Sequence, residues 1–401
     1  MGHEEKSVPG LAERSEPERG RVRITAVKAM ELREGAGQSL VKVETDSGLF
    51  GLGEAGARGP TTRAGLQWLE QILIGADPLA IDKLYQQMVG MQHTYQAHLP
   101  TVSGVDIALW DLTGKILGLP VSDLLTGRFR DRIEIYYRGG PPDWTDRGAM
   151  RAWVEELRAH PHGYRTLKLG FDYLLGKELP ADLVDAARPS QTLKPSHLEV
   201  IRRGFARLRE ALGDDLDFIV HCHNEWDYPS AVGLCRAAEG AHPLWMEDLL
   251  PLWYVDSYRA LRAASAVPIC TGEKLEGLRE FMPFLREGSV DVINPDLCWA
   301  GGFSGCRRIA ELADHFYIPV TTHNVGSLVQ TMACAHFGAS VRNFTMSEAR
   351  LCECPYIAAM GGVEFDVKQG LLAVPTGPGL GIELLPEVLR AELKEGEPYW
   401  A

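Results

Sequence analysis

The chain has 401 residues, of which 45% are apolar and 24% are charged, so it is long enough for two domains or for one large barrel with an appended unit. No stretch approaches the roughly eighteen consecutive apolar residues of a membrane-spanning helix, which argues against an integral membrane protein. The 41 basic and 54 acidic residues give a net charge of −13, which disfavours nucleic acid and anionic membranes as partners. An anionic substrate would therefore have to meet a local cation.

Residues 1–21 are rich in charged side chains and contain no apolar stretch that could serve as a secretory signal. We expect this segment to be a flexible tail and the protein to be cytoplasmic. The eight cysteines are spread over the second half of the chain and not framed at short spacing, which is typical of reduced, buried thiols.

Residues 22–124 are predicted to form an α+β capping domain. Two runs of alternating apolar residues flank the segment Asp46–Gly48, which is a hairpin pattern. Helical periodicity follows in three segments. The last of them carries Asp111 and Lys115 at the spacing of an i,i+4 ion pair and ends at Gly118. The three predicted helices cover residues 63–74, 79–91 and 102–117.

From residue 125 to residue 360, eight short β-branched or apolar runs alternate with helical segments, which is the pattern of a closed parallel barrel. We therefore predict an α/β fold, a (β/α)7β TIM-like barrel whose cap is formed by the N-terminal region and the C-terminal tail. The segment after Phe171 is predicted to be a loop insertion over the barrel mouth. Residues 361–401 contain a hairpin pattern and are expected to return to the capping domain. The predicted strands cover residues 132–138, 164–171, 216–223, 243–248, 267–273, 289–296, 318–323 and 343–348.

Acidic or imidazole side chains stand at or near the end of each predicted strand from the third onward. Because parallel strands all point the same way, these side chains are expected to meet at one rim, where barrel enzymes keep their active sites. Any one of them alone would be interpreted as an ordinary polar residue at a strand end, but the whole set is better explained by chemistry. The residues are His221, His223, Glu247, Glu273, Asp296, His323 and Glu348.

Two of these carboxylates predict a metal site. Glu247 and Glu273 lie one strand apart and would repel each other in a partly dry cavity unless a cation lay between them. Hard oxygen ligands suit Mg²⁺, and His221 on the preceding strand is the natural third ligand, although its imidazole favours Mn²⁺ or a related ion. If His221 does not bind the metal, Glu225 or Asp227 in the following loop is the alternative.

The remaining residues predict proton transfer. Asp296 can accept a hydrogen bond from His323 and so fix its tautomer and raise its basicity. His223 lies two residues beyond His221, so strand alternation predicts that both point to the same face. It would approach the substrate from the side opposite His323, while Glu348 would share a proton with a substrate oxygen.

These motifs resemble the mandelate racemase branch of the enolase superfamily, whose members abstract the proton α to a carboxylate and hold the resulting enediolate on Mg²⁺. The resemblance extends from about residue 22 onward. It implies that Glu247 and Glu273 bind the metal, that Asp296 and His323 form the base dyad, and that Glu348 assists the enolate. It also implies an even-numbered homo-oligomer. The motifs that carry it are SGVDIALWDLTGKILGLPV, GYRTLKLG, WMED, TGEK, VDVINPD followed by GG, TTHN and VPTGPGLG.

Four positions refine the resemblance. The family's second strand often reads Lys-x-Lys, whereas this chain has Lys168, Leu169 and Gly170, so a two-base racemisation is hard to support. By resemblance Lys168 would lie near the substrate carboxylate; the alternative is a solvated cation at the rim. His223 resembles the second histidine of galactonate and mannonate dehydratases, which protonates the departing hydroxyl. His221 stands where relatives place an aspartate, which leaves the metal's identity and catalytic competence open.

The sequence therefore predicts a metal-dependent dehydratase that converts a small acid sugar, an aldonate or aldarate, to a 2-keto-3-deoxy acid. The alternatives are an epimerase, racemase or cycloisomerase on the same scaffold, and a catalytically silent barrel with a binding role. We expect substrate specificity to come from the loop 53–63, from the insertion after Phe171, and from Arg138 and Trp299 at strand ends.

Overall fold

The computed structural model describes residues 20–33, 37–90, 98–170, 190–351, 354–362 and 365–400. Among its described helices, none combines the length and apolar character needed to cross a bilayer. The predictions for residues 1–19 of the tail and for the insertion that follows Phe171 lie outside the described residues.

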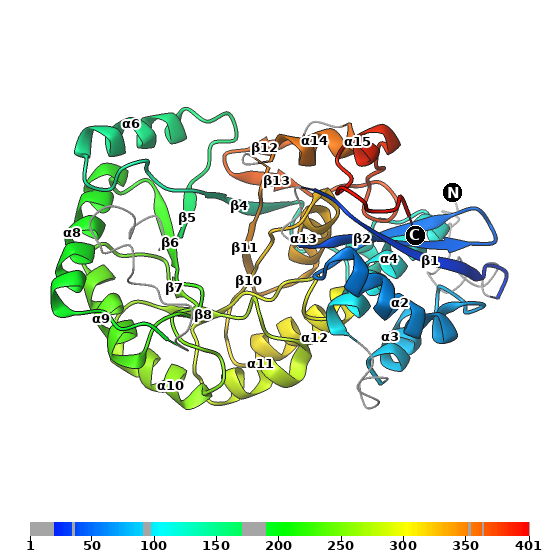
Figure 1. Ribbon diagram of the computed structural model, residues 1–401, viewed down its shortest axis with the longest axis horizontal. Coiled ribbons are helices and arrows are strands. Elements are labelled where there is room, and N and C mark those ends of the chain that lie inside the picture. Colours follow the sequence, from blue (N-terminus) through cyan, green and yellow to red (C-terminus); the bar gives the residue numbers. More distant parts are fainter. Residues whose placement is uncertain are drawn as a thin grey trace, which may run out of the picture.

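The N-terminal part forms an antiparallel sheet with three helices against it (Figure 1). The predicted hairpin is confirmed, because β2 and β3 pair in register on either side of a turn in which Gly48 has a φ of 83°. That left-handed conformation is open to glycine without steric cost. The strands are β1 (Ile24–Glu31), β2 (Ser39–Thr45) and β3 (Phe50–Ala55), and the helices are α2 (Gly59–Leu73), α3 (Ile81–Gly90) and α4 (Leu99–Leu117).

Helix α4 is the central element of this unit. It begins three residues earlier than the sequence pattern predicts and ends at Gly118, whose φ of 70° gives a left-handed C-cap. The predicted ion pair is present, with Lys115 Nζ 2.6 Å from Asp111 Oδ2. The buried Asp111 also accepts hydrogen bonds from the backbone N–H groups of Leu52 and Leu380. One carboxylate thus joins α4 to β3 and to the C-terminal segment.

The eight-stranded parallel barrel is confirmed. Neighbouring strands pair in chain order, and β11 pairs in parallel with β4 to close the ring. The strands are β4 (Arg132–Arg138), β5 (Thr166–Gly170), β6 (Asp217–His221), β7 (Met246–Glu247), β8 (Ile269–Thr271), β9 (Val292–Ile293), β10 (Val320–Thr322) and β11 (Phe344–Glu348).

Helices connect these strands and lie outside the ring (Figure 1). They cover the outer face of the strands, so the barrel's main hydrophobic core lies between helices and sheet. The connecting helices are α6 (Arg147–Arg158), α8 (Pro195–Leu212), α9 (Tyr228–Glu239), α10 (Val255–Ala264), α11 (Gly277–Arg286), α12 (Gly302–His315) and α13 (Leu328–Ser340), with α5 (Val121–Leu125) before the barrel and α14 (Pro355–Gly361) after it.

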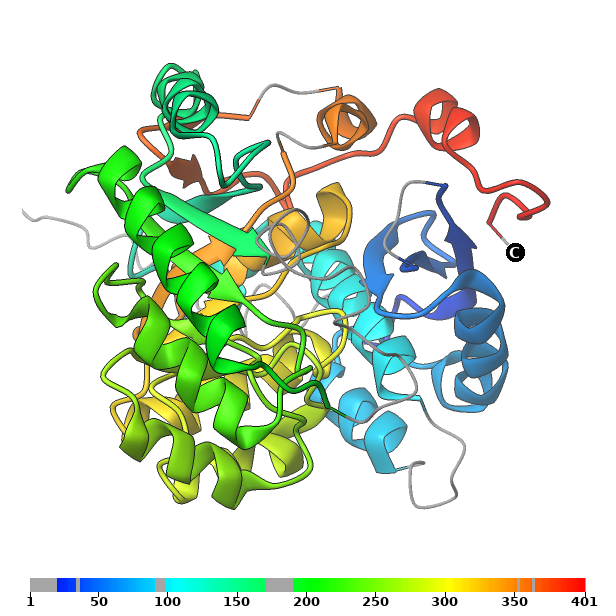
Figure 2. The same ribbon diagram turned by 60° about the vertical axis from the view of Figure 1, so that its left-hand side comes forward.

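The C-terminal segment contains the predicted hairpin, formed by β12 (Val367–Lys368) and β13 (Leu371–Ala373), but β13 pairs with β4 of the barrel and not with the N-terminal sheet. The residues beyond the hairpin reach the cap. Leu393, which follows α15 (Pro386–Ala391), forms a β-bridge with Leu32 at the end of β1. Figure 2 shows this stretch beside the N-terminal sheet.

A small apolar cluster from six different barrel segments is buried apart from the main core. Ile219 and Trp245 belong to it, and each precedes a polar strand-end residue by two positions. Because side chains alternate along a strand, the apolar cluster and the polar residues face the same side, one layer apart. The cluster therefore supports the polar layer from below. Its members are Tyr136, Ile219, Trp245, Cys270, Val292 and Met346.

Candidate active site

The strand register brings polar residues of different strands side by side at one end of the barrel. His221 is in register with Glu247 on one side and with Gly170 on the other, and a β-bridge joins Asp296 to His323. The site thus draws on residues from segments nearly two hundred positions apart in the chain. Their arrangement follows from the parallel order of the strands.

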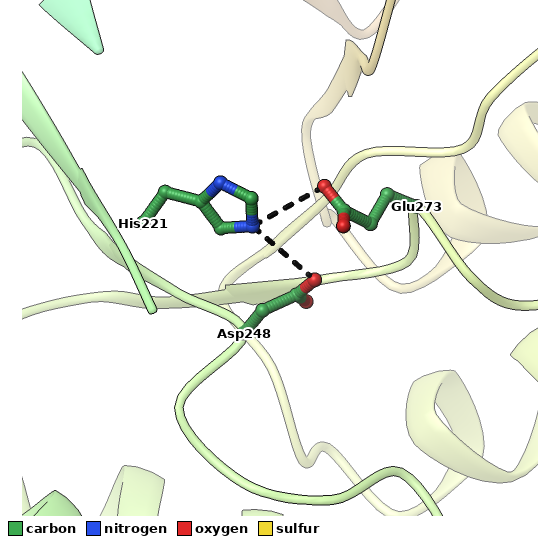
Figure 3. Close-up of side chains that lie close together, drawn as sticks. All are labelled: His221, Asp248 and Glu273. Atoms are coloured by element: carbon green, nitrogen blue, oxygen red, sulfur yellow. Dashed lines mark ion pairs between the residues drawn. The ribbon is translucent and has the colours of Figure 1, made fainter. Parts of the chain in front are cut away.

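Three buried carboxylate oxygens lie close to Nε2 of His221. Its Nε2 lies 3.3 Å from Oε2 of Glu273, 3.7 Å from Oδ2 of Asp248 and 3.9 Å from Oε1 of Glu247. Oε1 of Glu247 is also paired with Lys168 Nζ at 2.5 Å, whereas Nε2 of His221, Oδ2 of Asp248 and Oε2 of Glu273 have no hydrogen-bond partner within the described residues. Figure 3 shows the ring nitrogen of His221 pointing at the two carboxylates that come from separate segments. Buried polar groups left unsatisfied are costly, so the three atoms of His221, Asp248 and Glu273 that point at one place fit a divalent cation.

Asp248 is a candidate ligand that the sequence analysis did not select. It follows Glu247 directly, so strand alternation predicts that it points away from the cavity. The strand ends at Glu247, however, and Asp248 has a φ of 54°. Its Oδ1 accepts a hydrogen bond of 2.5 Å from Thr271 Oγ1, which leaves Oδ2 facing His221. The adjacent Glu-Asp pair at a strand end was the signal available in the sequence.

The two carboxylate oxygens of Glu247, a predicted ligand, have different partners. Its Oε2 accepts a hydrogen bond of 3.0 Å from the indole N–H of Trp245. Its Oε1 forms an ion pair of 2.5 Å with Lys168 and lies 3.9 Å from His221 Nε2. Both oxygens are therefore oriented, and Oε1 can serve a cation beside His221.

Lys168 is buried with 2% of its surface exposed, so the interpretation as a solvated cation at the rim is wrong. Its ammonium also donates to Oε2 of Glu348 at 3.1 Å. Burial lowers the pKa of Lys168, but Glu247 and Glu348 together raise it well above the ordinary value. Burial in turn raises the pKa of Glu348, yet Lys168, His323 and Arg138 bring it down to about 2. Lys168 and Glu348 are therefore both ionised although both are buried.

Asp296 and His323 lie in direct contact. Nδ1 of His323 donates to Oδ2 of Asp296 at 2.7 Å, and Oδ1 of the same carboxylate accepts from the backbone N–H of Cys298 and the side-chain amide of Gln330. Because Nδ1 faces Asp296, Nε2 is the ring nitrogen that faces Glu273 and Glu348.

Nε2 of His323 lies 3.4 Å from Oε2 of Glu273 and 3.9 Å from Oε2 of Glu348. Burial lowers the pKa of His323, but the carboxylates of Glu273, Glu348 and Asp296 raise it to about 9. The same balance holds at His221, where burial and Lys168 lower the pKa while Glu273 and Asp248 raise it to about 9. Both imidazoles therefore lie in a strongly negative environment.

His223 lies beside His221, with ring centroids 4.0 Å apart and planes tilted by 40°. The alternation argument does not apply to it, because β6 ends at His221 and His223 has a φ of 53°. The chain bends after the strand, and the bend brings the second ring alongside the first.

A second cation, Lys274, was not selected from the sequence. Its ammonium lies 3.2 Å from Oε1 of Glu273 and 3.7 Å from Oδ2 of Asp248, and it donates to Asn224. The indole N–H of Trp299 donates to the backbone carbonyl of Lys274 at 3.3 Å. This lysine follows Glu273 directly in the chain, and 42% of its side chain is exposed.

The other predicted positions have different surroundings. Asp227, an alternative to His221 as a ligand, is the N-cap of α9 and accepts from the backbone N–H of Ser230 and the hydroxyl of Thr192. Arg138 lies 3.6 Å from Oε1 of Glu348 at the barrel mouth.

Comparison with known proteins shows which family the chain is similar to. Residues 18–126 match the family model described as the mandelate racemase / muconate lactonizing enzyme N-terminal domain, and residues 149–388 match the enolase C-terminal domain-like model. The chain is 31% identical over 368 residues to a D-xylonate dehydratase of Haloferax volcanii, covering 89% of this chain and 86% of the relative. It is 30% identical over 377 residues to a D-galactonate dehydratase of Xanthomonas campestris, covering 90% and 92%.

Solved structures agree. A mandelate racemase/muconate lactonizing enzyme-like protein from Rubrobacter xylanophilus superposes with a TM-score of 0.84 at 30% identity, covering 94% of this chain and 99% of that one. The resemblance inferred from the motifs is thereby confirmed.

Proposed function

This chain belongs to the mandelate racemase / muconate lactonizing enzyme family, and we propose that it dehydrates an acid sugar, an aldonate or aldarate, to a 2-keto-3-deoxy acid. Relatives that carry acid-sugar dehydratase names at about 30% identity support a hydro-lyase activity. The observation that carries the proposal is the position of His323 Nε2, 3.4 Å from a carboxylate of the buried donor cluster. A proton acceptor and a cation site so close together suit the removal of a proton next to a carboxylate.

Magnesium or manganese would be held by His221, Asp248 and Glu273, with Glu247 as a further donor through Oε1. The bound ion would supply positive charge where negative charge develops on the substrate carboxylate. The imidazole in this donor set favours Mn²⁺ more than a set of three carboxylates would.

His323 is proposed to act as the general base. Asp296 holds the proton on Nδ1, so Nε2 accepts the proton from C2 of the substrate. Such a base contributes about a hundredfold to ten thousandfold to the rate. Lys168 and Glu348, which form a buried ion pair, would orient the substrate carboxylate and assist the enolate.

His223 is proposed to act as the general acid. It gives a proton to the C3 hydroxyl, which leaves as water, and the resulting enol takes up a proton at C3 to give the keto acid. The ring lies beside His221, at the opposite side of the donor cluster from His323 in the order of the strands.

The proposal favours elimination over racemisation because β5 carries no second base. Lys168 is followed two positions later by Gly170, which is in register with His221 and has no side chain to move a proton. A racemase or epimerase would need a base on each side of the α carbon. Its product would keep the mass of the substrate, whereas dehydration removes one water.

The test is a screen of acid sugars with the purified protein in magnesium or manganese, with detection of the keto product by semicarbazide. The His323→Asn variant is the matched control: it should bind the ion and yield no product. Absence of keto acid from every acid sugar tested, in a protein that binds the ion, would refute the proposed function.

A further inference from the structure

The Asp296 and His323 pair is tied to the cap through a buried chain of hydrogen bonds. Glu54, near the end of β3, accepts from the backbone N–H of Ser327 at 2.9 Å and from its hydroxyl at 2.7 Å. It also accepts from the backbone N–H of Gln330 at 3.0 Å. Glu54 thus satisfies N–H groups in the first turn of α13, which have no partner within the helix.

Gln330 continues the chain toward the site. While its backbone is held by Glu54, its side-chain Nε2 donates to Oδ1 of Asp296 at 2.8 Å and approaches the carbonyl of His323 at 3.4 Å. Glu54 has 3% of its surface exposed and Gln330 has none. Bulk water therefore does not compete for these hydrogen bonds.

A second chain of hydrogen bonds from the same end of β3 reaches the same oxygen of Asp296. The backbone N–H of Gly56 donates to the carbonyl of Cys298 at 2.8 Å, and the N–H of Cys298 donates to Oδ1 of Asp296 at 2.7 Å. The start of α13 is closely packed against the Gln330 side chain, because a Cβ added at Gly326 would lie 2.2 Å from Oε1 of Gln330. Two routes from the cap therefore meet on one oxygen of Asp296.

We propose that Gln330, anchored by Glu54, is a positioning residue that holds Asp296, and through it His323, in the orientation of a general base. The cap in this way takes part in proton transfer without touching the substrate. The expected change in kcat rests on the proposed function, whereas the expected change in the orientation of His323 does not.

The kinetic test uses Gln330→Met, which keeps the length of the side chain and removes the donor. We expect kcat to fall about tenfold to a hundredfold, as for partners that orient a catalytic or ligating histidine, while KM and the dissociation constant for Mn²⁺ change less than about twofold. Glu54→Gln, which keeps the shape and removes the charge, should act in the same direction. Because the two changes lie on different segments, misfolding of one variant leaves the other to decide.

Asp106→Asn provides a matched control. Asp106 is also a buried carboxylate of the cap, and it accepts from the backbone N–H of Ser304 in the first turn of α12 at 2.9 Å. It has no part in the chain to Asp296. The variant should lower the melting temperature and leave kcat unchanged. An equal loss of kcat in Asp106→Asn would mean that loosening of the cap explains the effect, and would overturn the proposal.

A measurement without substrate separates this proposal from the proposed function. The Nδ1 proton of His323, hydrogen-bonded to a carboxylate, should give a downfield proton resonance that is identified by its absence in His323→Asn. We expect this resonance to shift or broaden in Gln330→Met and to persist in Asp106→Asn. An unchanged resonance in Gln330→Met would overturn the positioning role, even if the wild-type protein dehydrates no acid sugar.

Discussion

The ammonium of Lys168 lies 2.5 Å from Oε1 of Glu247, and the same ammonium donates to Glu348 at 3.1 Å. All three side chains are at most 3% exposed. One lysine therefore compensates two buried carboxylates next to the donor cluster of His221, Asp248 and Glu273. Lys168 thus neutralises buried negative charge inside the barrel, and in the proposed function it also orients the substrate carboxylate.

Removing Lys168 should destabilise the protein. In Lys168→Met two buried carboxylates lose their cation, which typically costs about 3–5 kcal/mol. The free energy of unfolding in urea, measured without divalent ions, checks this. Lys368→Met is the matched control, because the ion pair of Lys368 with Asp366 is solvent-exposed and should contribute at most about 1 kcal/mol. Equal stability of Lys168→Met and the wild type would contradict the buried pairing.

His221→Asp should change the preferred metal. The wild-type donor set contains an imidazole, so we expect tighter binding of Mn²⁺ than of Mg²⁺. A carboxylate at position 221 adds negative charge and a hard oxygen, and should strengthen Mg²⁺ binding by about tenfold or more. Isothermal titration calorimetry measures both affinities. If the two proteins bind Mg²⁺ equally, His221 does not contribute to the site.

Asp248→Asn should weaken Mn²⁺ binding by at least about tenfold, because it removes the charge from a buried oxygen that faces His221. Asp227→Asn is the control from the same neighbourhood. It replaces the N-cap of α9, so it should cost about 1 kcal/mol of stability at most and leave the affinity for Mn²⁺ unchanged. If Asp248→Asn binds Mn²⁺ as tightly as the wild type, Asp248 is not a ligand and the sequence prediction of Glu247 is favoured.

His223→Asn should separate the two proton transfers. With His323 intact, the C2 proton can still leave and return, so solvent deuterium should enter C2 while no keto acid forms. Mass spectrometry of the recovered substrate and semicarbazide detection of product measure the two steps. Loss of exchange together with loss of product would count against the assignment of His223 as the acid alone.

His336 should make stability depend on pH. Burial lowers the pKa of His336 from 6.5 to about 4, and its Nδ1 accepts from the backbone N–H of Ser122. As the pH falls, His336 therefore takes up a proton in the unfolded chain before it does so in the folded protein. The neutral, buried His336 stabilises the fold fully above about pH 6.5. This stabilisation, about 3 kcal/mol, is lost as the pH falls toward 4.

The His336→Asn variant is expected to lose this dependence. Urea unfolding between pH 4.5 and 7.5 gives the difference in free energy between wild type and variant. That difference should shrink as the pH falls. A constant difference would show that His336 does not titrate in this range.

Local patterns in the sequence predicted the barrel, the hairpin and the helix that carries Asp111 and Lys115. The reason is that these features depend on periods of two or 3.6 residues and on short-range chemistry such as the left-handed conformation of Gly118. The parallel order of the strands also let the sequence place polar residues at one rim, because every strand points toward it. In the structure β6, β7 and β11 end at His221, Glu247 and Glu348, whereas Glu273, Asp296 and His323 follow their strands.

The tertiary structure decided what those residues face. One left-handed residue after β7 turns Asp248 toward His221, although alternation along the strand predicts the opposite. Lys168 became an internal counter-ion because Glu247 and Glu348 reach it from other strands. Contacts such as that of Glu54 with α13 join residues some 270 positions apart, and no local period encodes them. They arise only when the cap packs on the barrel and excludes water from the groups between them.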